Sequence, residues 1–123
     1  MANLDYLCAK YGQELSEIKD ENILQKALGV LREDGIYAMF LWLENKNKNA
    51  RHKILSLLND KDIKSYLLQD SSNFPEEFDK FCKKLVSVLE DVDRLFLLKK
   101  ILERTLTYAL YHVKAGGENV EKA

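Results

Sequence analysis

Two histidines are the side chains of this chain best suited to acid–base catalysis or to metal binding. Neither His52 nor His112 belongs to a Glu-x-x-His pair of the kind that holds iron in helical bundles, and no cysteine stands at zinc-site spacing from either. The Gly116-Gly117 pair follows a predicted helix, so a helix cap explains it better than a phosphate-binding loop does. We therefore predict no metal site, no other cofactor and no catalytic residue.

One arginine–histidine pair invites comparison with a nuclease. Helical ribonucleases of the HEPN kind carry a histidine a few residues after an arginine. Here seven residues separate Arg104 from His112, which is longer than that motif allows. On a helix with 3.6 residues per turn the two side chains point about 80° apart. The sequence therefore favours a protein that is not an enzyme.

The cysteines also predict no chemistry. Cys8 and Cys82 are the only two, they lie far apart in the sequence, and each falls within a helical pattern of apolar residues. Isolated cysteines of this kind are usually small buried side chains of a reduced, intracellular protein. We predict that both are free thiols.

Composition and periodicity predict an all-α protein. The chain has 123 residues, of which 46% are hydrophobic and 32% charged, with one proline and five glycines. That is ordinary globular composition with too few turn residues for a sandwich or barrel. Apolar residues recur at helical spacing, and the alternation typical of strands does not persist. We predict a compact single-domain bundle of six or seven helices over residues 1–117, with residues 118–123 as a flexible tail.

The run from Leu28 to Leu43 is the strongest structural signal. Asp34-Gly35 interrupts it, because glycine readily adopts the left-handed conformation that ends a helix. Residues 36–43 are almost entirely apolar, and a helix that is apolar all round needs other helices around it. We predict a central helix from about Ile36 to Lys46 with Phe40 and Leu43 almost fully buried. Any part that the chain leaves uncovered would form an interface.

Capping residues predict where the other helices begin. Asp20, Asn49, Asp60 and Asp91 each precede an apolar-periodic stretch and can accept hydrogen bonds from its first amides. The helix after Asp91 is the longest and is expected to end at about Ala115. Its buried stripe is predicted to contain Leu95, Leu98, Leu102, Ala109 and Val113, widened by Phe96, Ile101, Leu106 and Tyr108.

The net charge of −1 hides an uneven distribution of charge. Residues 46–53 hold four bases and no acid, and residues 94–114 hold five bases and one acid. If both stretches lie on one face, they would bind a phosphate backbone without sequence preference. The candidate nucleic-acid-binding residues are Lys46, Lys48, Arg51, Lys53, Lys100, Arg104 and Lys114. The alternative for each stretch is an ordinary solvated helix surface.

Two stretches of the chain resemble a family of helical proteins. The motifs are Gly35-Ile36-x-Ala38-x-Phe40-Leu41-x-Leu43 followed by Lys46 and Lys48, and Arg104-x-x-x-Tyr108-Ala109-x-Tyr111-His112-x-Lys114. They resemble the small helical subunits of type III CRISPR effector complexes, above all the small subunit of the Cmr (III-B) complex. The resemblance covers about half of the chain.

The resemblance implies a structural role in antiviral defence. Such subunits stack along the complex beside the guide–target duplex and hold the RNA backbone, while other subunits cleave. Its implied partners are RNA and the other subunits of a ribonucleoprotein complex, with possible self-association.

The alternative is a helical protein–protein interaction or adaptor module that does not bind nucleic acid. No apolar run approaches the ~18 residues of a membrane span, and no secretory leader is evident. We therefore expect a cytoplasmic protein without membrane contact.

Overall fold

The computed structural model describes the backbone of residues 3–68 and 72–122, and the side chains of residues 3–68 and 72–116. Over this part of the chain there are seven α-helices, one 3₁₀ helix and no strand, as the sequence predicts. The elements are α1 (Leu4–Leu15), η1 (Ser16–Ile18), α2 (Glu21–Asp34), α3 (Ile36–Lys46), α4 (Lys48–Leu58), α5 (Lys61–Leu67), α6 (Phe78–Leu89) and α7 (Val92–Lys122).

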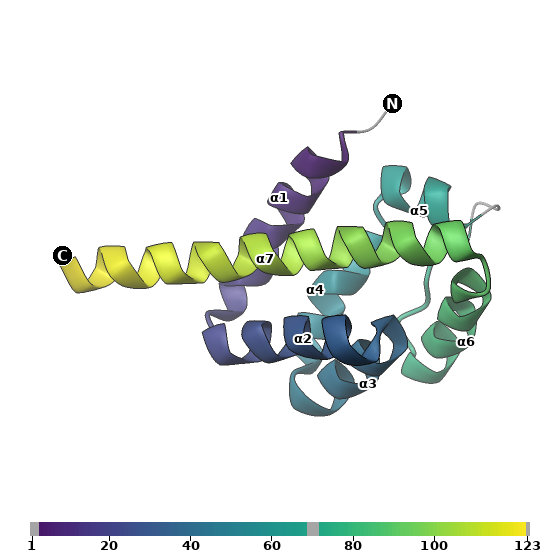
Figure 1. The fold of residues 1–123 in the computed structure, drawn as a ribbon, viewed down its shortest axis with the longest axis horizontal. Helices are drawn as coiled ribbons and strands as arrows, with labels where there is room; N and C mark the ends of the chain where they lie inside the picture. The colour runs from purple at the N-terminus through teal and green to yellow at the C-terminus, as the bar shows by residue number, and fades with distance from the viewer. Residues whose placement is uncertain (1–2, 69–71, 123) are drawn as a thin grey trace.

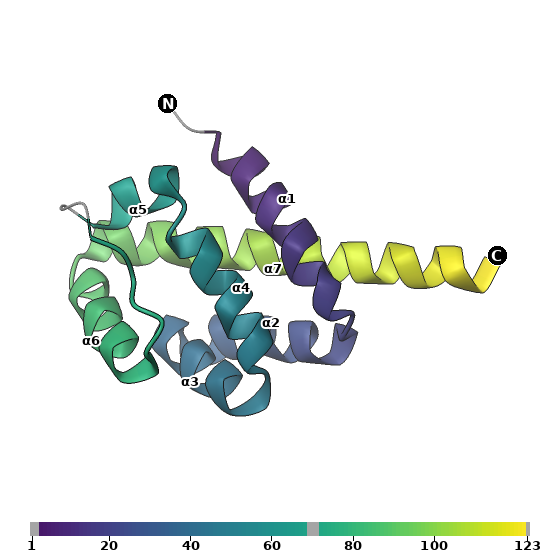
Figure 2. The ribbon, with the colours of Figure 1, turned by 180° about the vertical axis from the view of Figure 1, so that it is seen from behind.

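Helix α7 is the long axis of the molecule (Figure 1). It packs mainly against α1, which crosses it, and against α2, which runs beside it. Seen from behind, α1 and α4 lie in front of α7, and α6 leads into its first turn (Figure 2). Helix α3 packs on α2, α4 and α6, so it lies on the opposite side of α2 from α7. The last turns of α7 extend beyond the other helices (Figures 1 and 2).

Side-chain caps fix where most helices begin. The carboxylates of Asp20, Asp60 and Asp91 accept hydrogen bonds from the backbone amides of α2, α5 and α7, as predicted. The prediction of Asn49 as a cap is wrong, because Asn47 accepts the hydrogen bond from Ala50 N at 3.0 Å and α4 begins at Lys48. The two helices α3 and α4 are therefore joined by a single residue.

Gly35 separates α2 from α3, as predicted. Its φ of 103° is a conformation that side-chain-bearing residues rarely adopt. Its amide donates back to the carbonyls of Val30 and Leu31, which closes α2, and its carbonyl accepts from Met39, which opens α3. One residue thus ends one helix and starts the next at a sharp angle.

The C-terminal end of α7 differs from the prediction. The helix does not stop at Ala115 but continues through Gly116-Gly117 to Lys122. Glycine lowers the stability of a helix interior by about 1 kcal/mol without forbidding helical geometry, so a Gly pair is a weaker stop than a positive φ such as that of Gly35. The sequence predicts a flexible tail over residues 118–123. The side chains of these residues lie outside the described part of the chain, so the flexibility of the tail stays a prediction.

All seven α-helices contribute buried side chains to the core, and an aromatic cluster lies between α3 and α6. Phe40 and Leu43 are 0% and 1% exposed, which confirms their predicted burial. The rings of Phe40 and Phe81 meet edge to face with centroids 4.9 Å apart, and Phe74 lies 5.9 Å from Phe81. Edge-to-face pairs add to the stabilisation from buried apolar area. The aromatic cluster therefore joins α3 to α6 and to the segment before it.

Two predictions about apolar burial are wrong. Helix α3 is not enclosed on all sides, because Tyr37 and Leu41 are 37% and 46% exposed. The helices that pack against α3 are α2, α4 and α6, and they leave these two side chains partly uncovered. Phe96, predicted to widen the buried stripe of α7, is 64% exposed. Leu98, Leu102 and Ala109 are fully buried, as predicted.

The crossing of α1 over α7 depends on a glycine. A Cβ atom on Gly12 would lie 2.8 Å from the Cβ of Tyr108 and 3.2 Å from the carbonyl oxygen of Thr105. Both atoms belong to or adjoin the α7 backbone, so neither can rotate away. The absence of a side chain at Gly12 sets the close approach of the two helices.

We expect Gly12→Ala to lower the free energy of unfolding by about 1–3 kcal/mol, the usual cost of overpacking a core. Gly29→Ala is the matched control, because Gly29 lies within α2 and an added Cβ there meets nothing within 4 Å. That control should raise stability by up to about 1 kcal/mol through helix propensity alone. Urea unfolding followed by circular dichroism measures both, and a Gly12→Ala protein as stable as Gly29→Ala would contradict the close crossing.

Candidate nucleic-acid interface

Three of the seven predicted phosphate-binding residues lie along α7. Lys100 is exposed and has no acidic partner among the described residues. Arg104 lies 3.5 Å from Asp5 of α1, and Lys114 lies 3.8 Å from Glu21 of α2. The side chains in both pairs are 40–60% exposed. Exposed pairs of this geometry contribute little, roughly 0–1 kcal/mol, so these cations remain accessible to another anion.

The other predicted residues lie around α4 and differ among themselves. Lys46 and Lys48 flank the one-residue junction before α4, are exposed, and form no ion pair within the described part of the chain. Lys53 is half-buried and pairs with Glu17 of η1 at 3.5 Å. Two exposed lysines at the junction are thus left for an external anion.

Arg51 is not a phosphate contact, which corrects the prediction. Its side chain is 4% exposed, and its Nε donates to the Glu44 carboxylate at 2.7 Å. Its Nη2 donates to the backbone carbonyl of Glu76 at 3.1 Å. The guanidinium also lies over the rings of Phe78 and Phe81, 5.3 and 5.9 Å from their centroids. Arg51 therefore joins α3, α4 and the start of α6 from inside the fold.

The two basic regions do not form one continuous face. The Lys46–Lys48 junction lies at the far side of α2 from α7 in both views (Figures 1 and 2). Neither α3 nor α4 packs extensively on α7, and α1 contacts both α4 and α7. The acidic first third of the chain thus separates the two basic regions, and the outer side of α7 and the α3–α4 junction are two separate surfaces.

The residues of the nuclease-like pair have different surroundings. Arg104 lies beside Asp5, while His112 is exposed one turn before Gly116. The shallow pocket of about 90 Å³ beside Arg104 is lined by Leu4, Cys8 and Lys100, among others, and His112 is not part of it. No group of three or more histidine, cysteine or carboxylate side chains in the described part of the chain could hold a metal ion.

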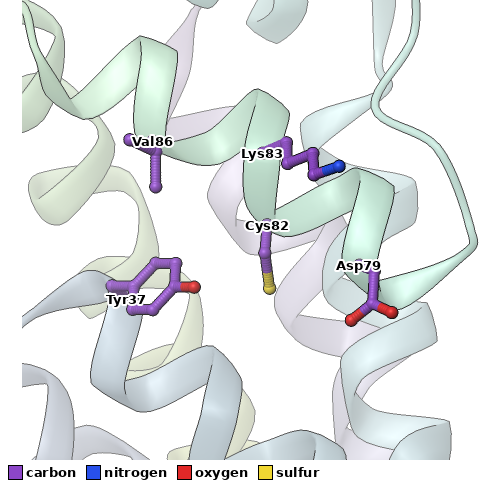
Figure 3. A pocket seen from close by; sticks show the side chains of 5 residues that line it. All are labelled: Tyr37, Asp79, Cys82, Lys83 and Val86. Carbon is purple, nitrogen blue, oxygen red and sulfur yellow. The ribbon is translucent and has the colours of Figure 1, made fainter.

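A groove of about 500 Å³ between α3 and α6 was not predicted (Figure 3). Tyr37 reaches across from α3, and four residues of α6 line the other side: Asp79, Cys82, Lys83 and Val86. Tyr37 and Val86 are 37% and 54% exposed, and Asp79 and Lys83 are charged, so the walls combine apolar and charged side chains. Tyr37 is the only tyrosine in the apolar run 36–43, but periodicity alone does not tell a core tyrosine from a surface one.

The cysteines are buried and free, as predicted. Burial raises the pKa of the Cys82 thiol, although a hydrogen bond from the Tyr37 hydroxyl opposes the shift. Burial likewise raises the pKa of Cys8, whose sulfur lies 3.7 Å from the carbonyl oxygen of Ile101. A raised pKa keeps both groups as neutral thiols at neutral pH, which makes them poor nucleophiles.

Comparison of the chain with protein-family models, with curated proteins and with solved structures gives no significant match. Among the described residues, no helix combines the length and the apolar character needed to cross a membrane. The observations that bear on function are therefore those of the molecule itself, above all the basic outer side of α7.

Proposed function

We propose that this protein is a non-catalytic subunit of an RNA-guided CRISPR effector complex and that it holds an RNA backbone through basic side chains. The observation that carries the proposal is the charge of α7, with five bases and one acid between residues 94 and 114. Three of these bases, Lys100, Arg104 and Lys114, point away from the core. The resemblance of the 35–48 and 104–114 stretches to small type III subunits supports the same role.

The exposed lysines at the α3–α4 junction support a second point of attachment. Lys46 and Lys48 are exposed residues on either side of the junction between α3 and α4, and this junction lies on the far side of α2 from α7 (Figure 1). A subunit with two separate basic surfaces can contact two strands, or one strand and its neighbour in an assembly. Phosphate contacts fix position without reading sequence, which is the role expected where base pairing supplies specificity.

RNA binding by the purified protein is expected to depend steeply on salt. Replacing Lys100, Arg104 and Lys114 together by glutamine should lower the slope of log affinity against log salt by about 0.7 for each phosphate that the variant no longer neutralises. Titration of a labelled RNA by fluorescence anisotropy between about 50 and 200 mM salt measures the slope. The double variant Lys46→Gln/Lys48→Gln, titrated in the same way, measures whether the lysines at the α3–α4 junction contribute to the slope.

The control variant changes the same charge elsewhere. Lys61, Lys80 and Lys83 are exposed lysines of α5 and α6, and their joint replacement by glutamine should leave the slope almost unchanged. Equal slopes for the α7 variant and this control would contradict phosphate binding by α7. Absence of RNA binding at low salt would contradict the whole proposal.

A second candidate function is a protein-interaction module, and the groove between α3 and α6 favours it. Tyr37 and Val86 expose apolar surface in this groove, and Leu41, one turn after Tyr37 in α3, is also exposed. A partner held there would stay bound as salt increases, because apolar association does not weaken with ionic strength. Salt-resistant binding that Val86→Asp abolishes would favour this candidate.

A further inference from the structure

The exposed aromatic residues of α7 share the outer side of the helix with its bases. Phe96 and Tyr111 are 64% and 63% exposed, although aromatic residues usually contribute to the core. At 100° per residue, both lie within about 40° of Lys100 around the helix axis. Arg104 and Lys114 fall in the same sector. We name this set the outer stripe of α7: Phe96, Lys100, Arg104, Tyr111 and Lys114.

We propose that the outer stripe of α7 binds single-stranded nucleic acid, with bases stacked on Phe96 and Tyr111 and phosphates held by Lys100, Arg104 and Lys114. This inference rests on the proposed RNA-binding function and specifies its ligand as an unpaired strand. Backbone contacts alone would require only the cations. Exposed aromatic rings combined with cations are the arrangement that single-strand binders use, because every base offers a face for stacking.

The dimensions and charge of the stripe fit such a ligand. At 1.5 Å per residue, the stripe extends about 27 Å from Phe96 to Lys114, enough for a few nucleotides. Aromatic residues lie near both ends, and Lys100 and Arg104 lie between them. An acidic peptide would satisfy the cations but would leave both rings without a stacking partner. Charge complementarity together with the two rings therefore favours a nucleic acid strand over an acidic protein.

Acidic residues on the neighbouring helices border the stripe and partly neutralise its positive charge. Asp5 of α1 accepts hydrogen bonds from both Arg104 and the Tyr108 hydroxyl. Glu21 of α2 lies 3.8 Å from Lys114. A bound phosphate must exchange with these carboxylates or share their cations. The acids thereby weaken binding, so removing one should tighten it.

The test measures binding of a fluorescein-labelled oligouridylate about 12 nucleotides long to the full chain at low salt. Loss of one stacking platform, in Phe96→Ala or Tyr111→Ala, should weaken binding by about fivefold to a hundredfold. The aromatic-retaining variants Phe96→Tyr and Tyr111→Phe should bind like the parent. Tyr66→Ala removes an exposed aromatic of α5 and is the matched control, with no effect expected.

Two further arms separate this inference from the proposed function. Asp5→Asn should bind the oligouridylate more tightly than the parent, whereas Asp79→Asn, which removes the same charge at the α3–α6 groove, should not. A duplex of the same length should bind more weakly than the single strand, because its bases are already stacked and paired.

Each outcome decides the question. RNA binding that the alanine variants leave intact, or equal binding of duplex and single strand, would overturn the stacking stripe and leave the proposed backbone role standing. Binding of polyglutamate as tight as that of RNA would assign the stripe to an acidic protein instead. No binding of either RNA at low salt would overturn both the stripe and the proposed function. All substituted positions are at the surface, and circular dichroism verifies that each variant is folded.

Discussion

Replacing Phe40 by alanine is expected to lower the free energy of unfolding by about 3–5 kcal/mol. Phe40 is fully buried, and its ring meets that of Phe81 edge to face at 4.9 Å. Truncation removes the transfer free energy of the ring and leaves a cavity where α3 meets α6. The aromatic cluster that joins α3 to α6 loses its ring from α3, the edge-to-face partner of Phe81, and the surrounding side chains fill the space only in part.

Leu41→Ala is the control for this measurement, because Leu41 is the next residue of the same helix and is 46% exposed. Truncating the Leu41 side chain should lower the free energy of unfolding by well under half as much as Phe40→Ala does. Urea unfolding monitored by circular dichroism at 222 nm gives both values. A Phe40→Ala protein as stable as Leu41→Ala would contradict the central position of α3.

Replacing Glu44 by glutamine should lower the free energy of unfolding by about 3 kcal/mol, because it leaves the Arg51 guanidinium buried without a counter-charge. Arg51 is 4% exposed at its side chain, while Glu44 is 23% exposed. The carbonyl of Glu76 and the rings of Phe78 and Phe81 remain as partners, which places the effect at the lower end for a broken buried pair. Removing one partner is costly mainly because the other cannot reach water.

The double variant Glu44→Gln/Arg51→Met tests this cause. It removes both charges at similar volume, so it should recover a large part of the lost stability. Glu77→Gln breaks the exposed pair with Lys80, in which both side chains are more than half exposed, and should change stability by less than about 0.5 kcal/mol. A double variant less stable than Glu44→Gln alone would mean that Arg51 acts through packing and not through its charge.

The helices and their order could be predicted from the sequence because they follow local rules. Asp20, Asp60 and Asp91 are short polar side chains placed just before apolar-periodic stretches, and each caps the helix that it precedes. Gly35 follows Asp34 inside an apolar run, and a polar residue followed by glycine is a common end of a helix. These signals involve residues within four positions of each other.

The environment of individual side chains could not be predicted in the same way. Arg51 is one of four bases in residues 46–53, and nothing in that stretch distinguishes the buried one from the exposed ones. The available clue was Glu44, the single acid between residues 36 and 53, which lies in the last turn of an apolar helix. A lone acid in such a position needs a cationic partner inside the fold.

The separation of the two basic regions also depends on tertiary structure. Charge counts identify the 46–53 and 94–114 stretches but contain no information about what lies between them in space. The interposed α1, η1 and α2 carry Asp5, Glu17 and Glu21, each of which meets a base of a distant stretch. The close crossing at Gly12 is unpredictable for the same reason, since its neighbour Tyr108 is far along the chain.

The pairing of α1 with α7 has a consequence for biosynthesis. The two helices lie at opposite ends of the chain, and the contacts between them join residues 93 to 103 positions apart. While the ribosome is still translating, α1 has emerged but its principal partner has not been made, so the apolar side of α1 faces water or a chaperone. The domain can complete its core only when almost the whole chain has left the exit tunnel. Nascent chains arrested before α7 should therefore remain protease-sensitive and bound by holdases, and the fold should form in one late step.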